Sequence, residues 1–263
     1  MKNILVLVHS DDGQESRLQC ALDVVRAVGG HLTCLDVAAP PIVYGDYVTS
    51  YTQAILIEDS VAAERENRTK LEPRLAAEGV PYTWAEVSGP IVECIVDQAG
   101  LNDLIVVGSH AEKGEALSGD VAAEIVRKVR RPLLAVSHSA HRIDLFGNAM
   151  IAWDGSDAAD AALRAAIPLL QLAHNAFVVT VGDTGSDPAD AASYCARHGV
   201  RAVVRAAPST GAVGDGLLDQ AVMLEAGWIV MGAFGHSPLR EAIFGGVTRQ
   251  MLERSTVPLL IAS

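Results

Sequence analysis

Aromatic residues are scarce in this chain of 263 amino acids: Phe, Trp and Tyr make up 5% of it, although 50% of the residues are hydrophobic. Ala, Val, Leu and Ile dominate that apolar half, which is typical of parallel strands buried between helices. Long apolar runs are also missing, since none approaches the roughly 20 residues of a membrane-spanning helix. We therefore expect no membrane segment, and one large domain or two small ones.

Paired cysteines and clustered basic residues are missing too. The cysteines show no CxxC or metal-ligand spacing, so we expect buried, reduced thiols in a cytoplasmic protein. They are Cys20, Cys34, Cys94 and Cys195. The formal net charge is −12 and the Lys and Arg residues are scattered, which argues against nucleic-acid binding through a basic patch. The apolar start at residues 3–8 has no cleavage site after it and predicts a strand, not a signal peptide.

The chain carries an internal repeat with a period near half its length. Residues 3–12 align with 148–157, 104–108 with 228–232, 119–122 with 245–248, and 131–137 with 257–263. Because the matches keep the same order, they indicate a tandem duplication. We expect a first domain over residues 1–138, a polar linker over 139–147 and a second domain over 148–263.

Within each half, short β-rich runs alternate with helical segments. The expected strands lie near 3–8, 31–37, 81–87, 103–107 and 132–136, and near 148–153, 176–181, 200–205, 228–232 and 258–262. This alternation predicts α/β domains, each with a parallel sheet covered on both faces. Only the first half adds an aromatic loop within 40–54 and a long helix ending near Ala77. The loop could be a lid, a subunit contact or a surface loop packed on its own domain.

A glycine-rich loop in the second half is the most informative motif. Gly232, Gly235 and Gly245 have the spacing Gly-x2-Gly-x9-Gly, between an apolar run that ends at Met231 and an amphipathic segment at 247–254. Glycine permits positive φ and close approach of backbone to a ligand. A helix N-terminus attracts phosphate through its free N–H groups and its dipole. The order strand, glycine loop, helix start therefore predicts a phosphate cradle.

These features resemble the universal stress protein family. Its ATP-binding members carry Gly-x2-Gly-x9-Gly-(Ser/Thr) between the fourth strand and the last helix, and an acidic residue at the end of the first strand, which Asp154 matches. The resemblance covers nearly the whole chain, as two consecutive domains. It implies two doubly wound, five-stranded parallel sheets of strand order 3-2-1-4-5, similar to adenine nucleotide alpha hydrolases. It also implies a pseudo-dimer of the two halves through their last strands, with further pairing of chains as a homodimer open.

By this resemblance the second half binds ATP, with Mg²⁺, in the crevice beyond its first and fourth strands. Asp154 would accept a hydrogen bond from the adenine amino group, and the Thr248 hydroxyl could assist the N–H groups that hold the phosphates. His236 and Arg240 either neutralise the terminal phosphates or are exposed loop residues. The expected nucleotide-binding residues are Ala152, Trp153, Asp154, Val181, Met231, Gly232, Gly235, His236, Arg240, Gly245, Gly246, Val247 and Thr248.

Both halves depart from the family pattern. Gly246 stands where the family usually has Ser or Thr, and the loss of one hydroxyl should weaken binding roughly tenfold. In the first half, His9 replaces the acidic residue, Ala111 replaces the second glycine, and Asp120 occupies the place of phosphate oxygens. A carboxylate at a helix N-terminus is itself stabilised by the dipole and would repel phosphate. We therefore expect the first half to bind no nucleotide.

Three functions remain open at this point. The first is a nucleotide-dependent regulator of the stress response, and the second is a nucleotide-free adaptor that works through protein contacts. The third is a weak ATPase. Hydrolysis would be slow at most, because the sequence has no Walker A motif and no carboxylate obviously placed to orient an attacking water. His138, His141 and Asp144 could bind a metal, but histidines in linkers are usually solvated.

Overall fold

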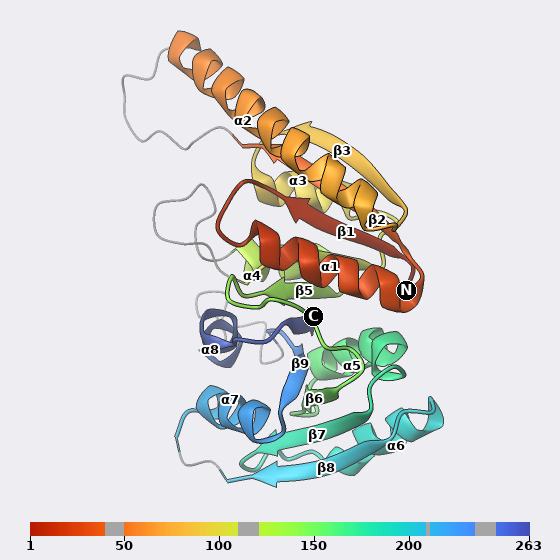
Figure 1. Ribbon diagram of the computed structural model, residues 1–263. Coiled ribbons are helices and arrows are strands. Elements are labelled where there is room, and N and C mark those ends of the chain that lie inside the picture. The colour runs from red at the N-terminus through yellow and green to blue at the C-terminus, as the bar shows by residue number, and fades with distance from the viewer. Residues whose placement is uncertain (40–49, 110–120, 209–210, 235–245) are drawn as a thin grey trace.

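The computed structural model describes residues 1–39, 50–109, 121–208, 211–234 and 246–263, the side chains of 50–57 excepted. These residues form a ten-stranded sheet of order β3-β2-β1-β4-β5-β10-β9-β6-β7-β8 (Figure 1). The strands of the first half are β1 (Asn3–Val8), β2 (His31–Ala38), β3 (Tyr82–Ser88), β4 (Leu104–Gly108) and β5 (Leu133–Val136). Those of the second half are β6 (Asn148–Ala152), β7 (Asn175–Val181), β8 (Ala202–Ala207), β9 (Ala226–Gly232) and β10 (Leu259–Ala262). The expected order 3-2-1-4-5 is thus confirmed in each half.

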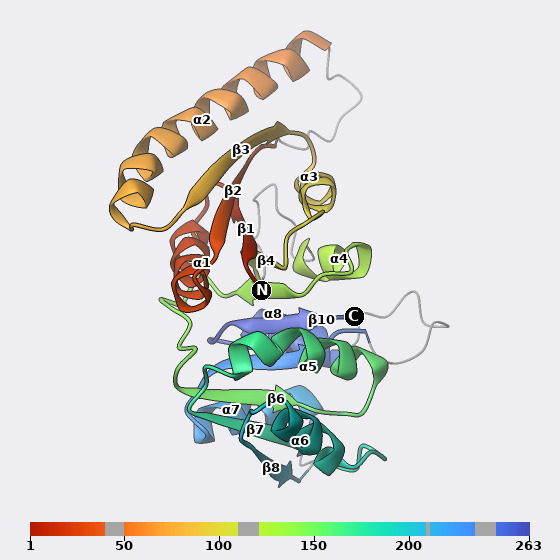
Figure 2. The same cartoon turned by 90° about the vertical axis from the view of Figure 1, so that its right-hand side faces the viewer.

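Helices cover both faces of the sheet (Figure 2). The first half contributes α1 (Gln14–Val28), α2 (Ser50–Ala77), α3 (Ile91–Gln98) and α4 (Val121–Lys128), and the second α5 (Asp157–Leu170), α6 (Pro188–Arg197), α7 (Val213–Met223) and α8 (Gly246–Arg254). Buried side chains of α1, α2, α5 and α6 share one core, and those of α3, α4, α7 and α8 share the other. Successive side chains of β1 point to opposite faces of the sheet, so Val6 lies in the first core and Leu5 in the second. Because both faces are buried, the sequence of β1 is apolar almost throughout. In the described ranges no helix has both the length and the hydropathy to cross a bilayer.

The halves join through their last strands. β10 pairs with β5 in antiparallel fashion, with Leu260 opposite Leu134, whereas the other neighbouring strands run parallel. This pairing confirms the pseudo-dimer and merges the two sheets into one. The linker expected over residues 139–147 is not fully solvated. Its apolar side chains Ala140, Ile143 and Leu145 are buried in the core of α1 and α5.

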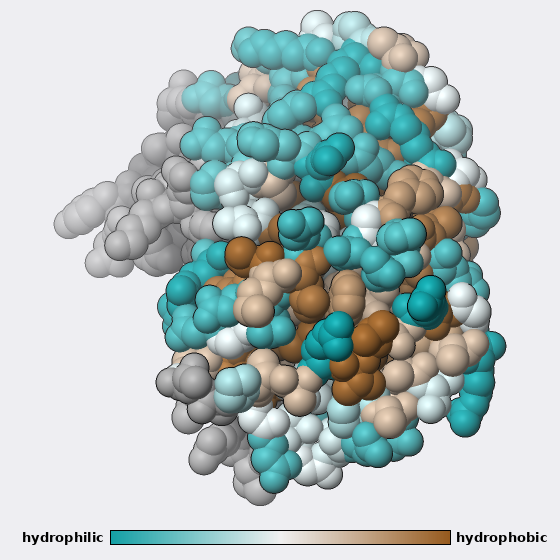
Figure 3. Space-filling model, turned by 60° about the horizontal axis from the view of Figure 1, so that its bottom comes forward, coloured by the Kyte–Doolittle hydropathy of each residue, from teal (hydrophilic) through white to brown (hydrophobic). Residues whose placement is uncertain are grey.

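The two edges of the sheet are covered unequally. Over the β3 edge lies the long helix α2, whereas the shorter α6 accompanies β8 (Figure 1). Val203 and Val204 of β8 are 36% exposed, and Val222 and Met223 at the end of α7 are 75% exposed. Figure 3 turns this end of the molecule forward and shows apolar residues grouped on its surface. Exposed apolar side chains beside an edge strand favour contacts with other chains.

All four cysteines are buried and unpaired, as expected from their spacing. Burial raises the pKa of Cys20 and of Cys34 to about 12, and that of Cys195 to about 11. These thiols are therefore protonated at neutral pH and pack as small apolar groups.

Candidate nucleotide site

A tight turn connects the carboxyl end of β6 to α5. Asp154 Oδ1 accepts hydrogen bonds from the backbone N–H (3.0 Å) and the hydroxyl (2.7 Å) of Ser156. Ser156 in turn caps α5, since its Oγ accepts from the N–H of Ala159 at 3.2 Å. Gly155 between them has a φ of +74°, and a Cβ there would lie 2.3 Å from Cβ of Ser186, so only glycine fits. The turn holds the half-buried Asp154 carboxylate at the end of the strand.

Gly232 lies beside this turn, at the end of the neighbouring strand. β6 pairs with β9 so that Ala152 is opposite Met231, and each chain leaves the sheet just beyond. A Cβ on Gly232 would lie 2.4 Å from the backbone N of Ala159, which leaves no room for a side chain. Sequence reasoning assigned Gly232 to close passage of a ligand. The structure adds a second reason for glycine, which is the close packing of β9 against the first turn of α5.

The expected base-lining residues lie at the ends of β6 and β7. The backbone N–H of Trp153 donates to Val179 at 2.9 Å and so continues the pairing of the two strands. The indole of Trp153 is 7% exposed and packs in the core of α5 and α6, where its Nε1 is buried and has no partner among the described residues. Val181 is also 7% exposed and faces α7. Side chains at these positions build the core, so it is the backbone that can reach a base.

The start of α8 is open to solvent on one side. Gly246 is exposed and Val247 is half-buried, whereas Thr248 is 5% exposed and lies on the face that packs on the sheet. A Cβ on Gly246 would meet none of the described residues within 4 Å, so their packing does not exclude Ser at this position. The predictions for four further positions concern residues outside the described ranges and stay predictions. These positions are Gly235, His236, Arg240 and Gly245.

In the first half, the position that matches Asp154 is organised around a different pair. His9 Nδ1 lies 2.7 Å from Oε1 of Glu64, which α2 supplies. Burial lowers the pKa of His9, but the hydrogen bond and the charge of Glu64 outweigh it, so the pKa is raised above its ordinary value. The contact with Glu64 occupies His9 Nδ1, so this nitrogen is not available to accept from an adenine amino group. This pair therefore supports the expectation for the first half, while Ala111 and Asp120 lie outside the described residues.

A buried arginine supports the same strand end. Arg17 is 2% exposed and donates to Asp11 Oδ1 at 2.8 Å, to the Leu7 carbonyl at 3.1 Å and to the His9 carbonyl at 3.0 Å. The repeat places Ala162, which is fully buried, at the matching position of the second half. Sequence reasoning missed Arg17, because an arginine on an amphipathic helix usually lies at the surface.

The first half also contacts the residue that precedes the expected phosphate loop. The guanidinium of Arg127 on α4 lies over the ring of Phe234, 5.4 Å from its centroid. Phe234 has a φ of +63°, which is uncommon for a residue with a side chain. Nearby, the hydroxyl of Ser263 donates to the carbonyl of Val126 at 2.9 Å. The loop thus starts from a point to which both halves contribute.

The linker histidines form no metal centre in the part of the chain that the structure describes, where no group of three or more potential ligands gathers. The Asp144 carboxylate instead accepts from the backbone N–H groups of Phe146 and Gly147, at 3.3 and 3.0 Å. Asp144 therefore stabilises the turn before β6.

The strand order, the antiparallel junction and the turn at Asp154 define a tandem pair of doubly wound α/β domains. The universal stress protein family matches residues 1–137 and 190–263, and the chain belongs to this family. A universal stress protein of Synechocystis sp. is 24% identical over 99% of this chain and 99% of its own length. A universal stress protein from Archaeoglobus fulgidus has the same fold with a TM-score of 0.74, at 19% identity over 98% of both chains. The structure of a putative universal stress protein from Pseudomonas aeruginosa matches with a TM-score of 0.64, at 16% identity over 100% of this chain and 93% of that protein's chain.

Proposed function

We propose that this tandem universal stress protein binds one ATP, with Mg²⁺, in its second half and acts as a nucleotide-dependent regulator of the stress response. The observation that supports this most is that Asp154 and Gly232 lie at the neighbouring carboxyl ends of β6 and β9. The strand order reverses between these two strands, and ligands of open α/β sheets bind beyond the carboxyl ends at such a point.

Asp154 would select adenine at this point. Its carboxylate can only accept hydrogen bonds, so it matches the amino group of adenine and would repel the carbonyl oxygen that guanine carries in its place. The phosphates would lie at the α8 N-terminus, where N–H groups of the first turn and the helix dipole favour negative charge. A bound cation such as Mg²⁺ would offset the repulsion expected in a protein of net charge −12.

The test is a calorimetric titration with Mg·ATP, first of the native chain and then of Asp154→Asn. Asparagine keeps an oxygen that can accept from Ser156, so the turn survives, but it replaces the other carboxylate oxygen with an amide that donates. We expect a loss of at least tenfold in affinity. The control is Asp160→Asn on α5, where an exposed acid pairs with Arg164 and binding should be unchanged. Equal affinity of native and Asp154→Asn protein would refute the assigned site.

Two further variants address the glycine loop. Gly246→Ser restores the family hydroxyl at a position with free space, and we expect ATP to bind up to roughly tenfold more tightly. Gly235→Val should block close passage of the backbone and remove nucleotide while the protein stays folded. Unchanged affinity in both variants would place the phosphates elsewhere.

The alternatives remain measurable in the same preparation. An adaptor without nucleotide is favoured by the exposed Val222 and Met223 at the end of α7, and it predicts no heat of ATP binding. A weak ATPase predicts turnover that disappears in Arg240→Ala or Asp154→Ala protein with an intact fold. Regulation predicts binding without appreciable turnover.

A further inference from the structure

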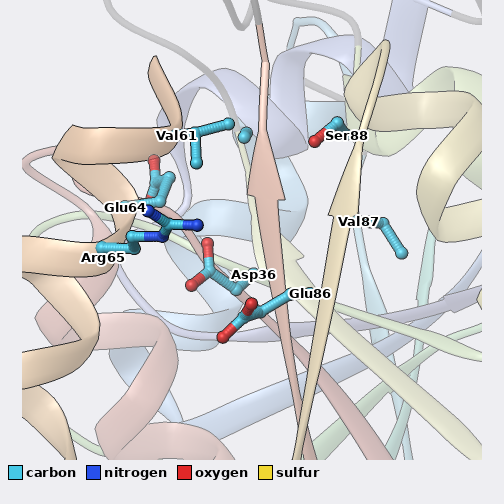
Figure 4. Close-up of a pocket in the computed structure, with 8 residues that line it drawn as sticks. Asp36, Val61, Glu64, Arg65, Glu86, Val87 and Ser88 are labelled. Atoms are coloured by element: carbon cyan, nitrogen blue, oxygen red, sulfur yellow. The ribbon is translucent and has the colours of Figure 1, made fainter. Parts of the chain in front are cut away.

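A pocket of about 250 Å³ lies in the first half, between α2 and the strands β2 and β3. Its lining combines three carboxyl groups with one arginine and several small or apolar residues: Asp36, Ala38, Val61, Glu64, Arg65, Glu86, Val87 and Ser88. In Figure 4 the carboxyl groups of Asp36 and Glu86 project from the strands toward α2, which carries Glu64 and Arg65. The pocket is remote in sequence from the proposed nucleotide site and makes no use of its residues.

Asp36 is the most deeply buried acid of this group, at 3% exposure. Its Oδ2 accepts from the indole N–H of Trp84 at 3.2 Å. Its Oδ1 is buried and has no hydrogen-bond partner among the described residues. A buried carboxylate oxygen that lacks a donor or a cation is costly.

The neighbouring acids have basic partners of their own. Glu64 lies 2.7 Å from His9, and Glu86 forms an ion pair with Arg68. The described residues form no ion pair between Arg65 and Asp36, although Figure 4 shows the Arg65 side chain directed toward the strands. Asp36 is therefore the carboxyl group of the three that forms no ion pair with the described residues.

Asp36 responds to this environment by holding a proton. Desolvation, followed by the charge of the nearby Glu64, raises the pKa of Asp36 to about 7. The Trp84 hydrogen bond opposes this shift, whereas a hydrogen bond shared with the Glu64 carboxyl group and the charge of Glu86 act in the same direction as burial. Near neutral pH the facing carboxyl groups of the pocket therefore either share a proton or bind another cation in its place.

We propose that this pocket binds a small aliphatic amine in its ammonium form. An ammonium group offers three N–H donors, which match Asp36 Oδ1 and a neighbouring carboxylate at the same level of the pocket. A short hydrocarbon chain fits against Ala38 and Val61. A metal ion fits less well, because no set of three or more ligands converges in the described part of the chain.

The test is calorimetric titration of the full chain with diaminobutane, and with butanediol as a neutral molecule of the same shape. Diaminobutane should bind at one saturable site and butanediol should not. Binding should be several-fold tighter one pH unit above the Asp36 pKa of about 7 than one unit below it, because the ammonium must displace the Asp36 proton. Exposed carboxylates are ionised at both values and would show no such change.

Variants separate the pocket from general acidity. Asp36→Asn should weaken diaminobutane binding at least tenfold, whereas Glu66→Gln on the solvent side of α2, where Glu66 pairs with Lys70, should leave it unchanged. Arg65→Gln should tighten it, because it removes a positive charge from the lining. Circular dichroism checks that each variant is folded, and the Arg65→Gln and pH results test the site even if Asp36→Asn is unstable.

The proposal is overturned if butanediol binds equally well, if affinity does not change with pH, or if Asp36→Asn binds as tightly as the native chain. Its fate is separate from that of the nucleotide proposal, since Asp36→Asn should leave ATP binding unaltered.

Discussion

The ends of β1 and β6 descend from one repeated segment but use their polar groups differently. At β6, Asp154 and Ser156 form a local turn whose bonds stay within one strand and helix. At β1, Arg17 and the His9–Glu64 pair tie the strand end to α1 and α2. At the β1 end, the polar side chains therefore form their hydrogen bonds and ion pairs with other elements of the first half. The same fold thus accommodates two different sets of polar partners at equivalent strand ends.

The additional length of α2 accompanies this change. α2 supplies Glu64 to His9 and covers the β3 edge, and the corresponding helix α6 of the second half spans 10 residues against 28 for α2. Polar partners and an amine-binding pocket in the first half thus come from the same inserted helix. The second half keeps the short connection and the acidic turn.

The largest expected effect distinguishes a buried from an exposed arginine. Arg17→Ala would leave Asp11 buried without its cation and would remove the guanidinium donors from the Leu7 and His9 carbonyls, so we expect a loss of about 3–5 kcal/mol in the free energy of unfolding. Arg164→Ala in α5, whose ion pair with Asp160 is exposed, should cost no more than about 0.5 kcal/mol. Urea denaturation measures both. Losses of similar size would mean that the β1 end does not depend on Arg17.

The next effect concerns the close packing at the β6 end. In Gly232→Ala the added carbon would lie 2.4 Å from backbone of α5, so α5 must move, at a cost of about 1–3 kcal/mol. Gly246→Ala places the same carbon where none of the described residues lies within 4 Å, and it should change the free energy of unfolding by less than about 0.5 kcal/mol. Thermal denaturation compares the two. If Gly232→Ala left the free energy of unfolding unchanged, the close packing of β9 against α5 would be refuted.

A third effect is the dependence of stability on pH, which should arise in the first half. The unfolded chain releases the Asp36 proton near its ordinary pKa of 3.8, whereas the folded chain holds it to about 7. Between these values the folded state binds more protons, so its stability falls as the pH rises. The raised pKa of His9 acts in the same direction.

Asp36→Asn should therefore be less sensitive to pH than the native chain. Unfolding in urea at pH ~5 and pH ~8 gives the comparison, because the amide does not titrate over that range. The account fails here if the variant loses as much stability toward alkaline pH as the native protein does.

The smallest expected effect is that of a substitution in the first half on the ATP affinity of the second half. Arg127→Ala removes the cation over the Phe234 ring, a contact worth about 0.5–1 kcal/mol at an exposed site. Because Phe234 precedes the expected phosphate loop, we predict a loss of about two- to fivefold in ATP affinity. Arg130→Ala, an exposed arginine just beyond α4, serves as the control in the same titration. Equal affinities in the two variants would mean that the first half does not support the loop.

Sequence patterns with local causes were sufficient for most of the fold. Apolar runs separated by helical periods located each strand to within about two residues, and the repeat with the family resemblance supplied the strand order. The positions of Asp154 and Gly232 at neighbouring strand ends follow from that order and are confirmed. What the bound nucleotide would touch stays a prediction.

Partners distant in the sequence explain what could not be predicted. Nothing near Gly232 reveals that Ala159 leaves no space for a side chain, and nothing near Arg17 reveals that it would be buried. The linker carries charged residues around Ile143 and Leu145, so its composition suggested a solvated segment, whereas tertiary packing buries these two side chains. Asp36 lies in an otherwise apolar strand, and its significance depends on Glu64 of a helix that follows much later.

The central claim, one nucleotide site per chain in the second half, is tested most directly by counting. Freshly purified protein is saturated with Mg·ATP, freed of unbound ligand and denatured, and the released nucleotide is identified and quantified by chromatography and mass spectrometry. The account predicts one adenine nucleotide per chain, lost in Asp154→Asn and retained in His9→Ala. Two nucleotides per chain, or none, would contradict it.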